Sequence, residues 1–343
     1  MKNTLVVTTI NGLTHEGLLH LIKESSVQKY KLIIIGDSKT PPALNSLEHI
    51  NVSYLNLNYQ INSSFRLGRS LPIGHYSRKN FGYLYAASLG FDWISETDDD
   101  NLIYPIFWEF QVPSRSIKNN SKCKWINIYK LFGHENIWHR GIPIDQVHDS
   151  NQVVIEDYFN HSTVACVQGL ANGDPDIDAI CRILYSPSAT FDAVESYTVG
   201  GGNFCPTNSQ MTRWKTDLTL PLLYLPSTVP WRVSDIWRGL IVQKFFSISG
   251  LSTQYRGGLG FQKRNQHNPL LDFIDEFEVH SKSHMLLEIL EQVNHRNPFE
   301  FMLSVYLELK SEKLVKAEEL IILQDWLTDV GTILNTTPNL LVP

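Results

Sequence analysis

The sequence predicts an α/β protein built on a doubly wound, mixed sheet, followed by a small helical subdomain. Three observations predict this class. Strand-like and helix-like segments alternate through about the first 110 residues, which is typical of a mostly parallel sheet. The strand-like segments are apolar on both faces, as parallel central strands are. From residue 281 onward, apolar side chains recur every three or four residues, which indicates helices.

The elements of the first part follow from these patterns. Each strand is a short β-branched run, and each helix has one apolar face. Gly90 suits the position just past a helix C-terminus. In chain order, we expect a strand over 5–10, a helix over 14–25, strands over 31–35 and 52–57, and a helix over 77–88.

The most informative feature is the acidic run over 96–100, which follows a predicted buried strand over 91–95. Neighbouring carboxylates repel each other and are costly to desolvate, so a divalent cation among them would explain the run. Alternate residues of an extended segment point the same way, which places Asp98 and Asp100 on one face and Asp99 on the other. Carboxylates suit Mg²⁺ or Mn²⁺, and these ions often bridge to phosphates. The run indicates an enzyme that handles a nucleotide diphosphate; a solvated acidic turn is the alternative.

The remaining chain is less regular in its middle and helical at its end. We expect one domain over 1–280, with a nucleotide-sugar-binding half over 1–110 and an acceptor-binding half over 111–280. A helical subdomain is predicted over 281–343.

Three helices are expected in that subdomain, over 284–293, 298–309 and 314–330. Pro298 suits the first turn of the second helix, and Gly331 suits a stop after the third.

The composition narrows the class of protein. The chain has 343 residues, of which 43% are hydrophobic and 19% charged, and its net charge is −6. This is ordinary globular composition, and the absence of a basic patch argues against nucleic acid as a partner. The four cysteines have no CxxC spacing, so we expect free thiols in a reducing compartment rather than a zinc or redox site.

No targeting or membrane-spanning segment is predicted. The apolar run near the N-terminus is too short for a signal peptide, and no window of ~18 apolar residues exists. We therefore expect a soluble, cytoplasmic protein with at most peripheral membrane contact.

Two further groups near the predicted carboxyl ends of strands are candidates for donor binding, because ligands of open α/β sheets bind there. Asp37 follows the second strand and suits a ribose hydroxyl or base N–H, although an Asx turn explains it equally well. Arg78, Lys79 and Asn80 begin a helix, where cations oppose the helix dipole unless an anion such as phosphate is bound. A solvated pair of cations is the alternative.

Polar residues further along are candidates for binding the acceptor. Asp174 and Asp176 suit sugar hydroxyls or a loop turn, and Asn208 and Gln210 suit hydroxyl recognition or loop capping. Arg232 lies in a segment that opens a later helix.

Asp235 lies in the first turn of that helix, where it either stabilises the helix dipole or serves as a general base. His267 is a candidate to complete a metal shell that already contains carboxylates, although a lone histidine is more often a plain polar residue.

In combination, five segments resemble the STELLO-type family of GT-A glycosyltransferases. They are residues 76–84, 98–100, 173–178, 208–210 and 232–236. The resemblance implies a GT-A-like fold, a nucleotide-sugar donor, and Mn²⁺ or Mg²⁺ held by the DxD aspartates. The plant members of the family have an N-terminal membrane anchor that this chain lacks, so a cytoplasmic microbial or viral enzyme making a surface glycan fits better.

The resulting hypothesis is a metal-dependent glycosyltransferase with a glycan or lipid-linked acceptor. Asp98, Asp100 and His267 would hold the metal, and Asp99 would join the donor-binding group. Asp235 would be the base if the reaction inverts configuration, which the sequence does not decide.

Three alternative functions are considered. A nucleotide-sugar mutase like the reversibly glycosylated polypeptides shares the three aspartates at a strand end. A non-catalytic scaffold of the same fold is the second. A nucleotidyltransferase is disfavoured because 10–14 contains one glycine and no glycine-rich phosphate loop.

Overall fold

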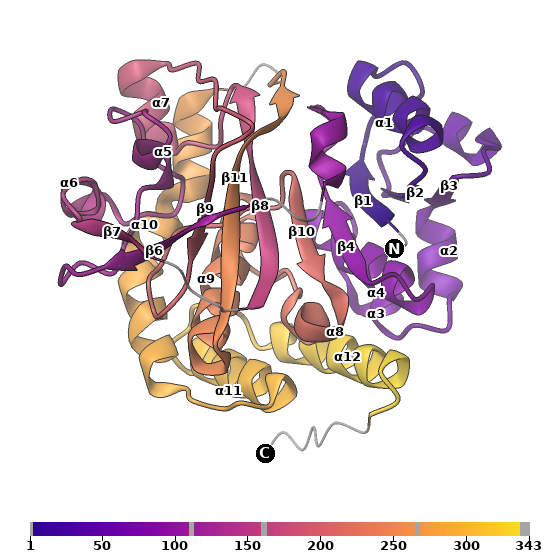
Figure 1. The fold of residues 1–343 in the computed structure, drawn as a ribbon. Coiled ribbons are helices and arrows are strands. Elements are labelled where there is room, and N and C mark those ends of the chain that lie inside the picture. Colours follow the sequence, from indigo (N-terminus) through magenta and orange to yellow (C-terminus); the bar gives the residue numbers. More distant parts are fainter. Residues whose placement is uncertain (1–2, 110–112, 159–162, 265–267, 337–343) are drawn as a thin grey trace.

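The computed structural model describes residues 3–109, 113–158, 163–264 and 268–336 of the chain. Over these residues the strands form one mixed sheet in the order β3-β2-β1-β4-β10-β8-β11-β9-β6-β7, with β5 paired to β11 (Figure 1). The predicted class, a mixed α/β sheet with a parallel N-terminal half and C-terminal helices, is confirmed.

The first half of the sheet is parallel. Its strands are rich in Val, Leu and Ile and are buried on both faces. Leu5 and Val7 face the apolar cluster under α1, whereas Val6 faces the cluster under α4. The elements are β1 (Asn3–Thr9), α1 (Glu16–Val27), β2 (Lys31–Gly36), β3 (Val52–Leu55), α2 (Leu57–Asn62), α3 (Leu67–Ser70), α4 (Lys79–Ser88) and β4 (Trp93–Glu96).

The expected strand over 52–57 is two residues too long. Asn56 is the N-cap of α2, and its side-chain oxygen accepts a hydrogen bond from the Tyr59 N–H at 2.8 Å. An Asn side chain competes with strand pairing in this way, so the chain enters a helix directly after Leu55.

The second half joins through an antiparallel strand, β10, between β4 and β8. As a result β4, β8 and β11 run in the same direction, and Figure 1 shows the arrowheads of β8 and β11 at the same upper edge. The strands are β5 (Asn101–Ile103), β6 (Arg115–Asn119), β7 (Ile155–Tyr158), β8 (Thr163–Gly173), β9 (Ser196–Val199), β10 (Thr212–Lys215) and β11 (Leu251–Gln262).

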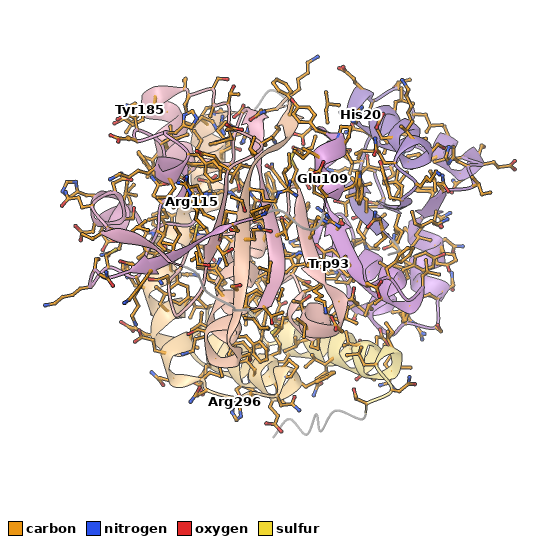
Figure 2. All side chains as sticks on the ribbon, in the orientation of Figure 1. His20, Trp93, Glu109, Arg115, Tyr185 and Arg296 are labelled. Atoms are coloured by element: carbon orange, nitrogen blue, oxygen red, sulfur yellow. The ribbon has the colours of Figure 1, made fainter. Side chains whose placement is uncertain are left out.

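Helices cover this half of the sheet and its lower end. Figure 2 shows His20 of α1 and Tyr185 of α7 at opposite upper corners of the molecule, with Arg296 at the bottom. The helices are α5 (Ile128–Leu131), α6 (Val147–Asn151), α7 (Ala179–Tyr185), α8 (Thr216–Thr219), α9 (Trp231–Ser249), α10 (Pro269–Gln292), α11 (Pro298–Ser311) and α12 (Glu318–Ile333). Short 3₁₀ turns lie at Pro42–Ser46, Tyr76–Arg78, Pro105–Trp108, Ile144–Gln146 and Leu220–Leu222.

The three expected C-terminal helices exist, with two corrections. The first helix begins at Pro269 rather than at residue 284, because Asn268 caps it there. The Asn268 side-chain oxygen accepts a hydrogen bond from the Leu270 N–H at 3.0 Å. Gly331 is buried inside α12 and does not end it. Pro298 occupies the first turn of α11, as predicted.

Helix α12 packs against helices of the N-terminal half of the chain. It contacts α3 and α4, and its Asp329 accepts hydrogen bonds from the N–H groups of Arg66 and Leu67 at 3.1 and 2.9 Å. The side chains of α11 and α12 belong to the same apolar cluster as those of α4 and α9. The C-terminal helices therefore share one apolar core with the helices of the N-terminal half.

Two other expectations concern thiols and membrane helices. All four cysteines are free. Within the described parts of the chain, no helix combines the length and apolar character needed to cross a bilayer.

Candidate active site

The candidate site is a cavity of about 640 Å³ at the carboxyl edge of the parallel strands. The ends of β1 and β2 contribute Thr9 and Asp37 to its lining, and the loop after β4 contributes the three aspartates. The beginning of α9 closes the opposite side with Trp231. The cavity lies where ligands of open α/β sheets bind.

Asp99 fixes the acidic loop to the end of β1. Its Oδ2 accepts hydrogen bonds from the Thr9 hydroxyl and, at 3.0 Å, from the Asn11 amide. Helix α1 approaches the same loop so closely that a Cβ on Gly17 would lie 2.0 Å from the Asp99 carbonyl oxygen. Glycine at this position lets the helix and the acidic loop touch.

Asp98 is held by two groups from the segment before α4. The Lys79 Nζ lies 3.0 Å from its Oδ1, and the Tyr76 hydroxyl donates to the same oxygen at 2.7 Å. Burial raises the pKa of Asp98, and the charge of Lys79 together with the Tyr76 hydrogen bond partly offsets this. The loop thus carries one carboxylate whose charge is already compensated.

Among the described residues, no lysine or arginine forms an ion pair with Asp100 as Lys79 does with Asp98. The oxygens of Asp100 accept hydrogen bonds from the amides of Asn101, at 3.1 Å, and Gln262, at 3.3 Å. Burial, together with the negative charge of Asp98, raises the pKa of Asp100 to about 7. A cation bound between these carboxylates would favour their charged forms and would lower the pKa of Asp100.

The carboxylate oxygens of the cavity suit a hard divalent cation whose other ligands come from water and the substrate. The described residues contain no group of three His, Cys, Asp or Glu side chains arranged as a complete metal cage. Mg²⁺ characteristically uses one or two carboxylates, with waters and substrate phosphates as its other ligands. Asp98 and Asp100 both line the cavity and offer carboxylates of this kind, whereas His267 lies outside the described residues.

The cations expected to bind phosphate, Arg78 and Lys79, are buried and hydrogen-bonded to groups of the protein. Each N–H of the Lys79 ammonium has an acceptor, because Nζ also contacts the Tyr76 hydroxyl at 2.7 Å and the Ser209 carbonyl at 3.2 Å. Arg78 borders the cavity, but its guanidinium donates to Gln60 at 2.9 Å and to the Leu71 carbonyl at 2.8 Å. These contacts hold Arg78 and Lys79 in place beside the cavity.

The side chains of Asn80 and Asp37 also form hydrogen bonds with backbone groups. The Asn80 amide bonds the Leu225 carbonyl and N–H at 2.9 and 2.8 Å, and Asn80 is buried outside the cavity lining. The Asp37 carboxylate accepts from the N–H groups of Ser38, Gly74 and His75 at 2.6, 2.9 and 3.1 Å. The Asp37 carboxylate therefore ties the end of β2 to the loop at residues 74 and 75, rather than bonding the N–H two residues on as in an Asx turn. It still borders the cavity.

The expected acceptor residues divide into two groups. Asp176, Gln210 and Arg232 border the cavity. Asp174 instead pairs with Arg182, and Asn208 is buried beside Asp176, to which its amide donates at 2.8 Å. The structure does not place these last two at the cavity, because both are used to fix loops.

Arg140, which borders the cavity, is a candidate site residue that the sequence does not reveal. Its buried guanidinium binds Asp176 through Nε and one terminal nitrogen at 2.9 and 3.0 Å. It binds Asp235 through both terminal nitrogens at 3.0 and 2.8 Å. Although burial raises the pKa of Asp176, the charge of Arg140 lowers it below its usual range. No motif surrounds Arg140, and only the fold brings its partners together.

Asp235, the candidate base, is heavily hydrogen-bonded. Besides Arg140, the Ser209 N–H and hydroxyl lie 3.3 Å from its Oδ2. The Ser209 hydroxyl also contacts the Tyr76 hydroxyl, which donates to Asp98. A chain of hydrogen bonds therefore links the proposed metal carboxylate to Asp235. Proton transfer to Asp235 requires that one of its present hydrogen bonds be exchanged for the acceptor hydroxyl.

Comparisons with known proteins agree with the resemblance seen in the sequence. The sequence profile of the STELLO glycosyltransferases matches residues 232–342. The chain is 23% identical to "Probable glycosyltransferase STELLO1" of Arabidopsis thaliana over 98% of its length, and 25% identical to "Probable glycosyltransferase STELLO2" over 83%. It spans only 45% and 39% of those relatives. The resemblance to STELLO glycosyltransferases is confirmed.

Solved structures give more distant likenesses. Glucosyl-3-phosphoglycerate synthase of Mycobacterium tuberculosis with phosphoglyceric acid has a TM-score of 0.41 and 12% identity, covering 82% of this chain and 79% of that one. The same enzyme with Mn²⁺, UDP and phosphoglyceric acid has a TM-score of 0.38 and 12% identity, covering 84% and 77%. At these scores the likeness decides neither substrate nor mechanism.

Proposed function

We propose that this chain is a metal-dependent glycosyltransferase that moves a sugar from a nucleotide-diphosphate sugar to the hydroxyl of a glycan or lipid-linked acceptor. The observation that carries the proposal is the placement of Asp98 and Asp100 in one cavity at the carboxyl edge of a parallel sheet. Partial burial there, together with the charge of Asp98, raises the pKa of Asp100 to about 7. An ionised carboxylate in this position destabilises the metal-free protein, and a bound cation would offset that destabilisation. The similarity to STELLO glycosyltransferases supports the same class.

The donor would lie across the ends of β1 and β2. Its diphosphate would face Asp98 and Asp100, and its nucleoside would extend toward Asp37 and Lys39, which line the same cavity. Mn²⁺ or Mg²⁺, when bound, neutralises charge on a diphosphate leaving group. Asp99 would act by holding the loop through Thr9 rather than by binding the metal.

The acceptor would enter from the side of α9. If the reaction inverts configuration, Asp235 would accept the proton of the acceptor hydroxyl after releasing a bond to Ser209 or Arg140. A positioned base contributes about 10²–10⁴-fold to the rate. We therefore expect that magnitude of loss in Asp235→Asn, with donor binding retained. Full activity in this variant would remove Asp235 from the mechanism.

The test is a thermal-shift screen of UDP-, GDP-, ADP- and dTDP-sugars, each with Mn²⁺ and with EDTA. A ligand at 100 times its dissociation constant stabilises the native state by about 2.7 kcal/mol. We expect at least one nucleotide sugar to raise the melting temperature only with metal, and this shift to be lost in the variant carrying Asp98→Asn and Asp100→Asn. Asp92→Asn, an exposed aspartate before β4, is the matched control. Metal-independent shifts, or equal shifts in all variants, would overturn the proposal.

The donor found in the screen then separates transfer from isomerisation. Ring isomerisation of the donor without acceptor would identify a mutase, whereas transfer that requires an acceptor supports the proposal. A role in surface polysaccharide synthesis and a cytoplasmic location stay predictions from the sequence.

A further inference from the structure

Trp231, the first residue of α9, presents an aromatic surface to the cavity. It lines the cavity, and 42% of its surface is exposed. A large aromatic side chain that borders a cavity without being buried has unused contact area.

The indole is held in a fixed orientation. Its Nε1–H donates to Asp275 of α10 at 2.9 Å. The guanidinium carbon of Arg232 lies 5.2 Å from the ring centroid, which covers part of the indole surface. A ring fixed in this way needs little further ordering when a ligand packs on its remaining exposed surface.

The charges beside this ring are already compensated. The Arg232 Nε donates to Glu276 at 2.6 Å, and Arg232 also lies 3.7 Å from Asp272. Arg264, another lining residue, donates to the same Asp272 at 2.8 Å. Two guanidinium groups thus face two carboxylates.

Arg140, deeper in the same part of the cavity, lies between two further carboxylates. Among the described residues of this cluster, three guanidinium groups therefore meet four carboxylates. They are Arg140, Arg232 and Arg264 with Asp176, Asp235, Asp272 and Glu276. An anionic acceptor would meet no excess of positive charge here, whereas hydroxyl groups can donate to these carboxylates.

We propose that Trp231 is the platform on which the ring of a neutral saccharide acceptor packs, with its hydroxyls directed toward the carboxylates around Arg140. The apolar C–H face of a sugar ring complements an aromatic surface, and its hydroxyl edge complements carboxylates. This inference rests on the proposed function and narrows it, because it excludes phosphorylated or carboxylated acceptors as preferred substrates.

The experiment measures transfer from the donor found in the screen to paired acceptors of matched shape. The methyl glycosides of glucose, galactose and mannose are compared with the 6-phosphates of the same three sugars. We expect transfer to at least one methyl glycoside, and at least tenfold lower kcat/KM for each 6-phosphate.

The variants Trp231→Ala and Trp231→Phe then test the platform. Trp231→Ala should raise the acceptor KM roughly tenfold while kcat changes little, because the lost contact is present before and during the reaction. Trp231→Phe should recover most of the affinity. Tyr185→Ala on α7, which removes an aromatic residue that is 56% exposed and outside the cavity lining, is the control (Figure 2).

The outcomes separate this inference from the function on which it rests. Metal-dependent donor binding with a preference for the 6-phosphates, or an unchanged acceptor KM in Trp231→Ala, would overturn the inference and leave the transferase proposal standing. Failure of every nucleotide sugar to bind the wild-type protein would overturn both.

Discussion

Replacing Asp100 by asparagine should stabilise the metal-free protein at alkaline pH. The substitution keeps the size of the side chain and removes a charge that the fold disfavours. The pKa of Asp100 is raised from 3.8 to about 7 in the folded state by burial and by Asp98. The folded protein therefore holds a proton that the unfolded chain releases between these two values, and stability falls as the pH rises through that window.

The size of the effect follows from the shift. Roughly three pKa units correspond to about 4 kcal/mol when the pH lies above both values, and about 3 kcal/mol of this develops between pH 5 and pH 8. Asp100→Asn has no carboxylate that loses a proton, so this destabilisation is absent from the variant. Between pH 5 and pH 8 its free energy of unfolding should therefore rise relative to the wild type by up to about 3 kcal/mol. Below pH 4 the difference should no longer depend on this charge.

The assay is thermal unfolding in EDTA at pH 5 and pH 8, with Asp92→Asn as the exposed control. On the size scaling of small domains, the relative gain of Asp100→Asn at pH 8 is on the order of 5 °C. Mn²⁺ should raise the melting temperature of the wild type and have little effect on Asp100→Asn. Parallel pH profiles for the two proteins, or equal stabilisation of both by Mn²⁺, would refute the reasoning.

Three further substitutions test the surroundings of the site. Arg140→Met leaves Asp176 and Asp235 buried without their cation and should cost about 3–5 kcal/mol in urea unfolding; a loss below 1 kcal/mol would show that these carboxylates find other partners. Glu96→Gln removes the charge opposite the fully buried Arg238 and should destabilise by a similar ~3–5 kcal/mol in the same assay, whereas an unchanged midpoint would contradict this. Gly17→Ala forces α1 and the Asp99 backbone apart and should weaken Mn²⁺-dependent donor binding in calorimetry while the far-UV spectrum stays the same; wild-type affinity would show that the loop position is irrelevant to metal binding.

The parallel half of the fold and its acidic loop were predictable because their signals are local. A strand such as β2 is apolar over consecutive residues, and an acidic run directly after β4 must lie at the carboxyl edge of the sheet. The end of α12 was not predictable in the same way. Gly331 suits a helix stop on propensity alone, but tertiary packing keeps it inside the helix.

The site partners were less predictable because they depend on distant contacts. Arg140 meets carboxylates 36 and 95 residues away in the sequence. Lys79 was expected to face phosphate, but it compensates Asp98 instead. For Lys79 the residue type indicated a charge near the site, but the direction of the side chain was decided by burial, because a buried cation must find its counter-charge within the protein.

The most direct test of the central claim is a crystal soaked with MnCl₂ and UDP, with anomalous diffraction recorded at the manganese edge. We expect an anomalous peak within coordination distance of a carboxylate oxygen of Asp100, with Asp98 and the diphosphate beside it. Bound UDP without manganese at these aspartates, or manganese at a site remote from the cavity, would contradict it.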